Sequence, residues 1–164
     1  MRKTWLLTIA VATAALTFGV GVAVAGPHFF SATGSVNSSG ALVVSWDETG
    51  LGNGDVTYTL DADATALYAC INNGGKHPSA ANKESFEGSV TTGGSFKAKN
   101  GRVQGTLTTG PLQAPQFTCP NGQTRILAAV SYSNIVLTDT TNNVPITIPD
   151  TGLVCLHPEF PGLC

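Results

Sequence analysis

Charge is what this sequence has least of. Asp, Glu, Lys and Arg together make up 11% of its 164 residues, and the formal net charge is −2. No stretch of the chain gathers lysine and arginine into a basic stripe, which argues against nucleic acid as a partner. Gly, Thr, Ser, Ala and Val are abundant instead. That composition is typical of a turn-rich β-protein rather than of a helical one.

The motifs of several enzyme classes are also missing. The sequence contains no Gly-x-Ser-x-Gly, no His-Glu-x-x-His and no glycine-rich phosphate loop between a strand and a helix. Its histidines are His28, His77 and His157, and two of them lie in predicted tails. A serine hydrolase would need one of them beside an activated serine. We therefore predict a protein that is not an enzyme and that needs no cofactor.

The four cysteines do not have the spacing of a metal site, since no Cys-x-x-Cys occurs, and we predict no bound metal. An even number of cysteines in a secreted chain indicates two disulfides, with three possible pairings. We favour Cys70–Cys119, which would join an inward strand position to a nearby loop. The other pair would be Cys155–Cys164, which would close a short loop containing two prolines.

Residues 1–25 have the features of a secretory signal peptide. Arg2 and Lys3 make a positive start, an apolar run covers residues 5–22, and residues 23–25 form a small-x-small cleavage site. The apolar run is also about long enough to span a bilayer, roughly 20 residues, so a membrane anchor is the alternative. We favour cleavage after Ala25. This predicts one extracellular domain over residues 26–164 with no membrane attachment.

What the sequence does have is alternation of apolar and polar residues, the pattern of half-buried β-strands. It is longest over residues 56–70 and 124–138, and turn residues separate most of the shorter runs. A bend or bulge is expected near residues 61–63, and a helix over 61–69 is the alternative there. The pattern predicts an all-β fold. We expect an antiparallel β-sandwich of immunoglobulin-like architecture, with an open barrel as the alternative.

Four local expectations come from the same pattern. Gly93 and Gly94 are expected to end one strand and begin another, and Val136 is expected to face inward. Residues 26–30 are expected to be an irregular, flexible start. Phe29 and Phe30 in this start, and Phe160 in the C-terminal tail, are then expected to be spare aromatics. Residues 47–55 are expected to form a long turn, and its acidic and glycine residues leave calcium binding as the alternative.

The longest polar segment covers residues 72–83 and follows closely after Cys70 in the sequence. Such a loop is where a binding function would lie, and a solvated crossover is the alternative. A rigid exposed loop here or at residues 111–120 would also suit a protease-inhibitor-like protein, because preorganisation lowers the cost of binding. A carbohydrate-binding module is a further alternative, although most aromatics fall on predicted inner faces. The candidate binding residues are Asn72, Lys76, His77 and Lys83.

Two segments, Tyr68-Ala-Cys-Ile-Asn-Asn-Gly-Gly-Lys-His-Pro and Ser131-Tyr-Ser-Asn-Ile-Val-Leu-Thr-Asp-Thr-Thr-Asn, together with the signal peptide, resemble small secreted proteins of actinobacteria. The resemblance implies a β-sandwich and secretion, and it assigns no activity. We therefore expect a secreted, non-catalytic protein that acts in binding or in structure outside the cell. Its partner would be an extracellular protein or a glycan.

Overall fold

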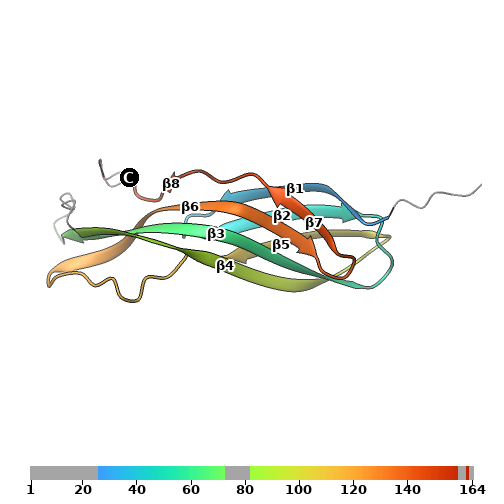
Figure 1. Ribbon diagram of the computed structural model, residues 1–164, viewed down its shortest axis with the longest axis horizontal. Helices are drawn as coiled ribbons and strands as arrows, with labels where there is room; N and C mark the ends of the chain where they lie inside the picture. The colour runs from blue at the N-terminus through green and yellow to red at the C-terminus, as the bar shows by residue number, and fades with distance from the viewer. Residues whose placement is uncertain (1–25, 73–81, 159–161, 163–164) are drawn as a thin grey trace, which may run out of the picture.

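A computed structural model describes residues 26–72, 82–158 and 162 (Figure 1). The predicted signal peptide and the residues Lys76, His77, Phe160 and Cys164 lie outside these ranges. Over the described residues the fold consists of strands only, and no helix there has the length and apolarity to cross a membrane. The strands are β1 (His28–Val36), β2 (Leu42–Thr49), β3 (Asp55–Asn72), β4 (Lys83–Lys97), β5 (Arg102–Thr109), β6 (Gln123–Asp139), β7 (Val144–Ile148) and β8 (Val154–Cys155).

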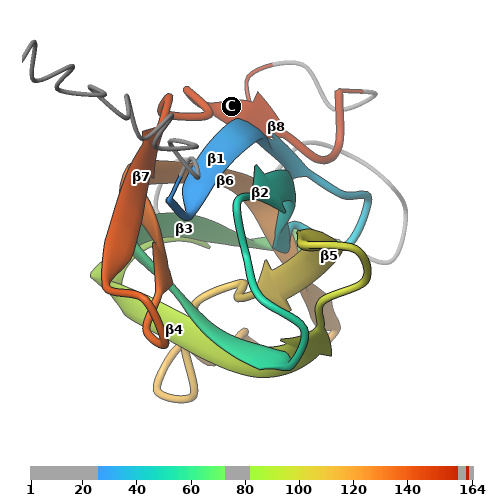
Figure 2. The same cartoon turned by 90° about the vertical axis from the view of Figure 1, so that its right-hand side faces the viewer.

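The strands form two antiparallel sheets. The smaller has the order β1-β2-β5, and the larger has the order β4-β3-β6-β7, with the short β8 also paired to β6. Figure 2 shows the strands of both sheets arranged around a common interior. The all-β antiparallel prediction is confirmed, and the immunoglobulin-like architecture stays a prediction.

β3 is the strand around which the larger sheet is built. It pairs with β4 from Asp55 to Ala69 and with β6 from Tyr58 to Asn72. Its even-numbered positions from 56 to 70 are apolar and buried, whereas Asp61 and Asp63 on its other face are exposed. The alternation therefore predicts this strand correctly, and the helix alternative over residues 61–69 is wrong.

β4 runs without a break through Gly93 and Gly94, where we expected one strand to end and another to begin. A Cβ atom on Gly93 would lie 2.9 Å from the carbonyl oxygen of Tyr58, and one on Gly94 would lie 3.1 Å from the ring of Phe96. These glycines thus allow close packing inside a strand rather than a turn, which corrects the prediction.

β6 changes phase at a bulge. Its register against β3 shifts between Asp61 and Asp63, but the extra residue lies on β6 and not on β3, the strand in which the bulge was expected. Asn134, with φ at 50°, occupies the shift. Beyond it, Ile135 and Leu137 are fully buried, and Val136 is not. The prediction that Val136 faces inward is wrong because the extra residue moves every later side chain to the opposite face.

The core begins nearer the N-terminus than expected. β1 starts at His28, whose Nε2 lies 3.1 Å from Thr49 Oγ1, so the predicted irregular start is wrong. Phe29 is not spare, because its ring packs edge-on against Tyr58 at 6.3 Å between centroids. Phe30, by contrast, is 74% exposed, as expected of a spare aromatic.

The disulfide Cys70–Cys119 is present, with its Cα atoms 5.6 Å apart. It joins β3 to the loop before β6, as predicted, and it indicates folding in an oxidising compartment. The second predicted pairing stays a prediction, because Cys164 lies outside the described residues. Cys155 lies in β8, opposite Ala129 of β6.

Candidate functional site

The loop predicted over residues 72–83 is shorter in the structure, because a strand takes up the residue at each end. Asn72 is the last residue of β3 and pairs with Gln123, and Lys83 is the first residue of β4. The Lys83 ammonium donates a hydrogen bond to the carbonyl oxygen of Gly162. The two described members of the candidate set are therefore strand residues, while Lys76 and His77 lie outside the described ranges.

The predicted turn over residues 47–55 is also shorter, because β2 continues through Asp47 and Glu48. Consecutive side chains of a strand point to opposite faces. Asp47 thus lies on the outer face of its sheet and Glu48 on the inner face, so the two do not act together as ligands of one cation. Within residues 26–72 and 82–158, no three His, Cys, Asp or Glu side chains are grouped to hold a metal.

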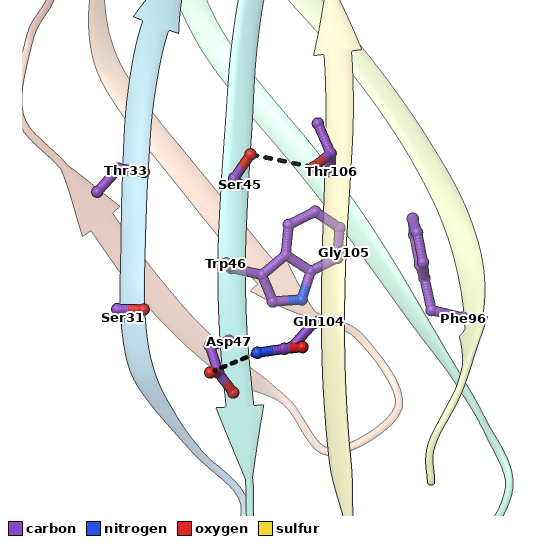
Figure 3. A pocket seen from close by; sticks show the side chains of 9 residues that line it. All are labelled: Ser31, Thr33, Ser45, Trp46, Asp47, Phe96, Gln104, Gly105 and Thr106. Carbon is purple, nitrogen blue, oxygen red and sulfur yellow. Dashed lines mark hydrogen bonds between the residues drawn. The ribbon is translucent and has the colours of Figure 1, made fainter.

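A shallow groove of about 540 Å³ lies on the three-stranded sheet (Figure 3). Its polar residues are outward-facing side chains of β1, β2 and β5. β4 contributes the aromatic ring of Phe96. The lining residues are Ser31, Thr33, Ser45, Trp46, Asp47, Phe96, Gln104, Gly105 and Thr106.

Cross-strand bonds hold the polar side chains that β2 and β5 contribute to the groove (Figure 3). The hydroxyl oxygens of Ser45 and Thr106 are 3.0 Å apart. Asp47 accepts a hydrogen bond of 3.1 Å from Gln104 Nε2 and a bidentate pair from Arg102, whose Nε lies 2.6 Å from Asp47 Oδ1. The bond from Arg102, joined by that from Gln104, holds the pKa of the Asp47 carboxyl below its usual range.

Gly105 makes room for the indole beside the groove. It pairs with Trp46 across β2 and β5, and a Cβ atom at this position would lie 2.4 Å from Trp46 Cζ2. The indole also packs against Phe96, with the ring centroids 4.9 Å apart. Trp46 is 4% exposed, whereas Phe96 is only partly buried. Phe96 is thus the ring that the groove presents to solvent.

A buried carboxyl lies on the inner face of the same sheet. Glu48 is fully buried, and its Oε2 accepts a hydrogen bond of 2.7 Å from the Tyr58 hydroxyl. Its Oε1 has no hydrogen-bond partner among the described residues, and neither has Trp46 Nε1. Burial raises the pKa of Glu48 to about 7; the Tyr58 bond opposes this rise, and the nearby Asp139 adds to it. Glu48 does not line the groove.

The loop over residues 111–120 is fastened to the larger sheet. Arg125 Nη1 donates to the carbonyl oxygens of Ala114 and Phe117, at 2.8 and 3.2 Å, and both residues are buried. The Phe117 amide donates to the Ala114 carbonyl at 3.2 Å. This makes a tight turn, with Pro115 and Gln116 exposed at its tip.

Sequence reasoning missed both the groove and the buried carboxyl. The polar alternation of Ser31 and Thr33, and that of Gln104 and Thr106, was the available signal for the groove, but it does not show which strands are neighbours. For Glu48 the signal was more direct, because the period of two that places Trp46 inward also places Glu48 inward. Comparisons of the chain with protein-family models, curated proteins and solved structures found no match.

Proposed function

We propose that the mature protein is a secreted, non-catalytic binding protein and that it binds its ligand in the groove on the β1-β2-β5 sheet. The observation that carries the proposal is the rigid lining of the groove. Arg102 and Gln104 of β5 both donate hydrogen bonds to Asp47 of β2. Side chains held in this way lose little conformational freedom when a ligand binds, which favours affinity.

Secretion is supported by the Cys70–Cys119 disulfide together with the sequence features of residues 1–25. Cleavage after Ala25 would place His28, the first residue of β1, third in the mature chain.

The chemistry of the groove suits binding better than catalysis. A carboxylate with a lowered pKa that is paired with Arg102 is a weak general base near neutral pH. The hydroxyl of Ser45 bonds to Thr106 rather than to a histidine. Glu48, whose raised pKa would suit an acid or base, is enclosed between the sheets.

The inhibitor alternative has less support. A protease cleft accepts an extended segment, often by strand addition. The loop over residues 111–120 instead forms a tight turn whose flanking residues, Ala114 and Phe117, point into the protein. Most of the other candidate loop, residues 72–83, lies outside the described residues.

The proposal is tested by filling the groove. Thr33 is an exposed residue of the groove lining, so Thr33→Trp should block the groove without removing any of the cross-strand hydrogen bonds described above. Thr108→Trp, on the same face of β5 but outside the groove, is the matched control. Purified residues 26–164 would be applied to a printed glycan array and to immobilised secreted proteases. We expect binding that Thr33→Trp weakens at least tenfold and that Thr108→Trp leaves intact. Binding that both variants retain would exclude the groove as the binding site.

A further inference from the structure

We infer that the ligand of the groove is a neutral glycan, with its hydroxyl groups bonded by the polar lining and one sugar ring in contact with the edge of the Phe96 ring (Figure 3). This inference rests on the proposed function and narrows the ligand to one chemical class. Charge, hydrogen-bonding capacity and exposed apolar surface each support it.

The charge of the groove is balanced. Asp47 is its acidic residue, and Arg102 neutralises it through a bidentate pair at the edge of the groove. The other polar lining side chains are hydroxyls and one amide. A phosphate, a sulfate or an acidic peptide would need unpaired cationic donors, and a cationic ligand would need an unpaired carboxylate. The lining therefore favours a ligand without net charge.

The hydrogen-bonding capacity matches a polyhydroxylated ligand. Hydroxyl side chains and the Gln104 amide both donate and accept, as sugar hydroxyls do. Asp47 adds an acceptor whose geometry is fixed by Arg102 and Gln104. Four hydroxyls lie in one groove, on Ser31, Thr33, Ser45 and Thr106. Its volume of about 540 Å³ lies within the range of small-molecule sites.

Apolar surface in the groove is limited to what one sugar face would cover. Phe96 is partly exposed, and its edge-on contact with Trp46 fixes its orientation. Protein partners usually insert or receive large apolar anchors. Among the described residues, the large apolar side chains that are most exposed are Phe30 and Leu153, and neither lines the groove. A protein partner is therefore the less favoured occupant.

The test compares the binding of neutral and of acidic glycans to the same protein variants. Isothermal titration would use neutral oligosaccharides of glucose, mannose, galactose and N-acetylglucosamine, and sulfated and uronic-acid oligosaccharides beside them. Gln104→Ala removes an exposed amide, and Thr108→Ala is its control on the same strand. We expect Gln104→Ala to weaken binding of a neutral oligosaccharide about tenfold, as loss of a good hydrogen bond would. Thr108→Ala should have no effect, and binding should persist in 0.5 M salt because no ion pair with the ligand is involved.

The outcomes separate the inference from the proposed function. Acidic glycans bound alone, or a protease bound alone, with binding lost in Thr33→Trp, would overturn the neutral-glycan inference and leave the groove proposal standing. Binding that is insensitive to Thr33→Trp, or no binding to any probe, would overturn both. Far-ultraviolet circular dichroism and urea midpoints equal to those of the wild type would exclude misfolding as the cause of lost binding.

Discussion

At the scale of single residues, Glu48 couples the stability of the protein to pH. Its pKa is about 7 in the folded protein against 4.5 for an ordinary glutamate. Between these values the native state holds a proton that the unfolded chain has released. The contribution of Glu48 to stability is therefore fully present below pH 4.5 and is lost as the pH rises through 7, an effect of at most about 3 kcal/mol.

Glu48→Gln should remove this dependence, because the amide does not titrate and its oxygen still accepts the bond from Tyr58. We expect the free energy of unfolding of the wild type to fall between pH 5 and pH 8, and that of the variant to fall less. Urea denaturation at the two pH values measures both. Asp61→Asn, on the exposed face of β3, should keep the wild-type slope. Identical pH profiles for Glu48→Gln and the wild type would show that Glu48 does not titrate in the interior.

Gly105 supplies a second test at this scale. The methyl group of Gly105→Ala would meet the Trp46 ring at 2.4 Å, so overpacking should destabilise the protein by about 1–3 kcal/mol. Gly52→Ala is the control, because nothing lies within 4 Å of its Cβ position. Trp46 is the one tryptophan of residues 26–164, so its fluorescence in a urea titration follows the unfolding of both variants. Equal midpoints for the two variants would contradict the proposed packing.

At the scale of elements, the bulge in β6 determines which of its side chains reach the core. Asn134 adopts φ of 50°, which glycine and asparagine tolerate and β-branched residues do not, and its Nδ2 donates to Asp63 at 2.8 Å. Asn134→Val should destabilise the protein by about 1–2 kcal/mol. Asn134→Gly, which keeps the backbone angle, should cost much less. Thermal unfolding of both variants checks this, and a fully stable Asn134→Val protein would argue against the bulge.

The long strands were predictable because each carries its own signal, the alternation of buried and exposed positions in β3 and β6. The errors came from residues whose meaning depends on distant neighbours. Gly93 and Gly94 serve packing against Tyr58 and Phe96, which a local pattern does not distinguish from a turn. The groove was unpredictable for the same reason, because Asp47 and Gln104 meet only through the register of β2 against β5.

At the scale of the whole molecule, one covalent link spans the part of the chain that joins the two sheets. Cys70 is the last buried residue of β3, and Cys119 lies 49 residues later. The loop that they close contains β4 of the larger sheet, β5 of the smaller sheet and the turn at Pro115 and Gln116. Closing a loop of this length removes conformational entropy from the unfolded chain worth about 4 kcal/mol in the chain-entropy model.

The paired variant Cys70→Ala/Cys119→Ala should therefore unfold at clearly lower urea than the wild type, with a loss of about 4 kcal/mol before any change in packing. Both cysteines are largely or partly covered, so each alanine also removes some buried surface. Cys70→Ala alone separates the two effects, because it breaks the link but keeps Cys119. If the link acts through the unfolded chain, the single and paired variants should lose nearly equal stability. A paired variant as stable as the wild type would mean that the contacts of Arg125 and Tyr68 with residues 112–117 hold that loop without the disulfide.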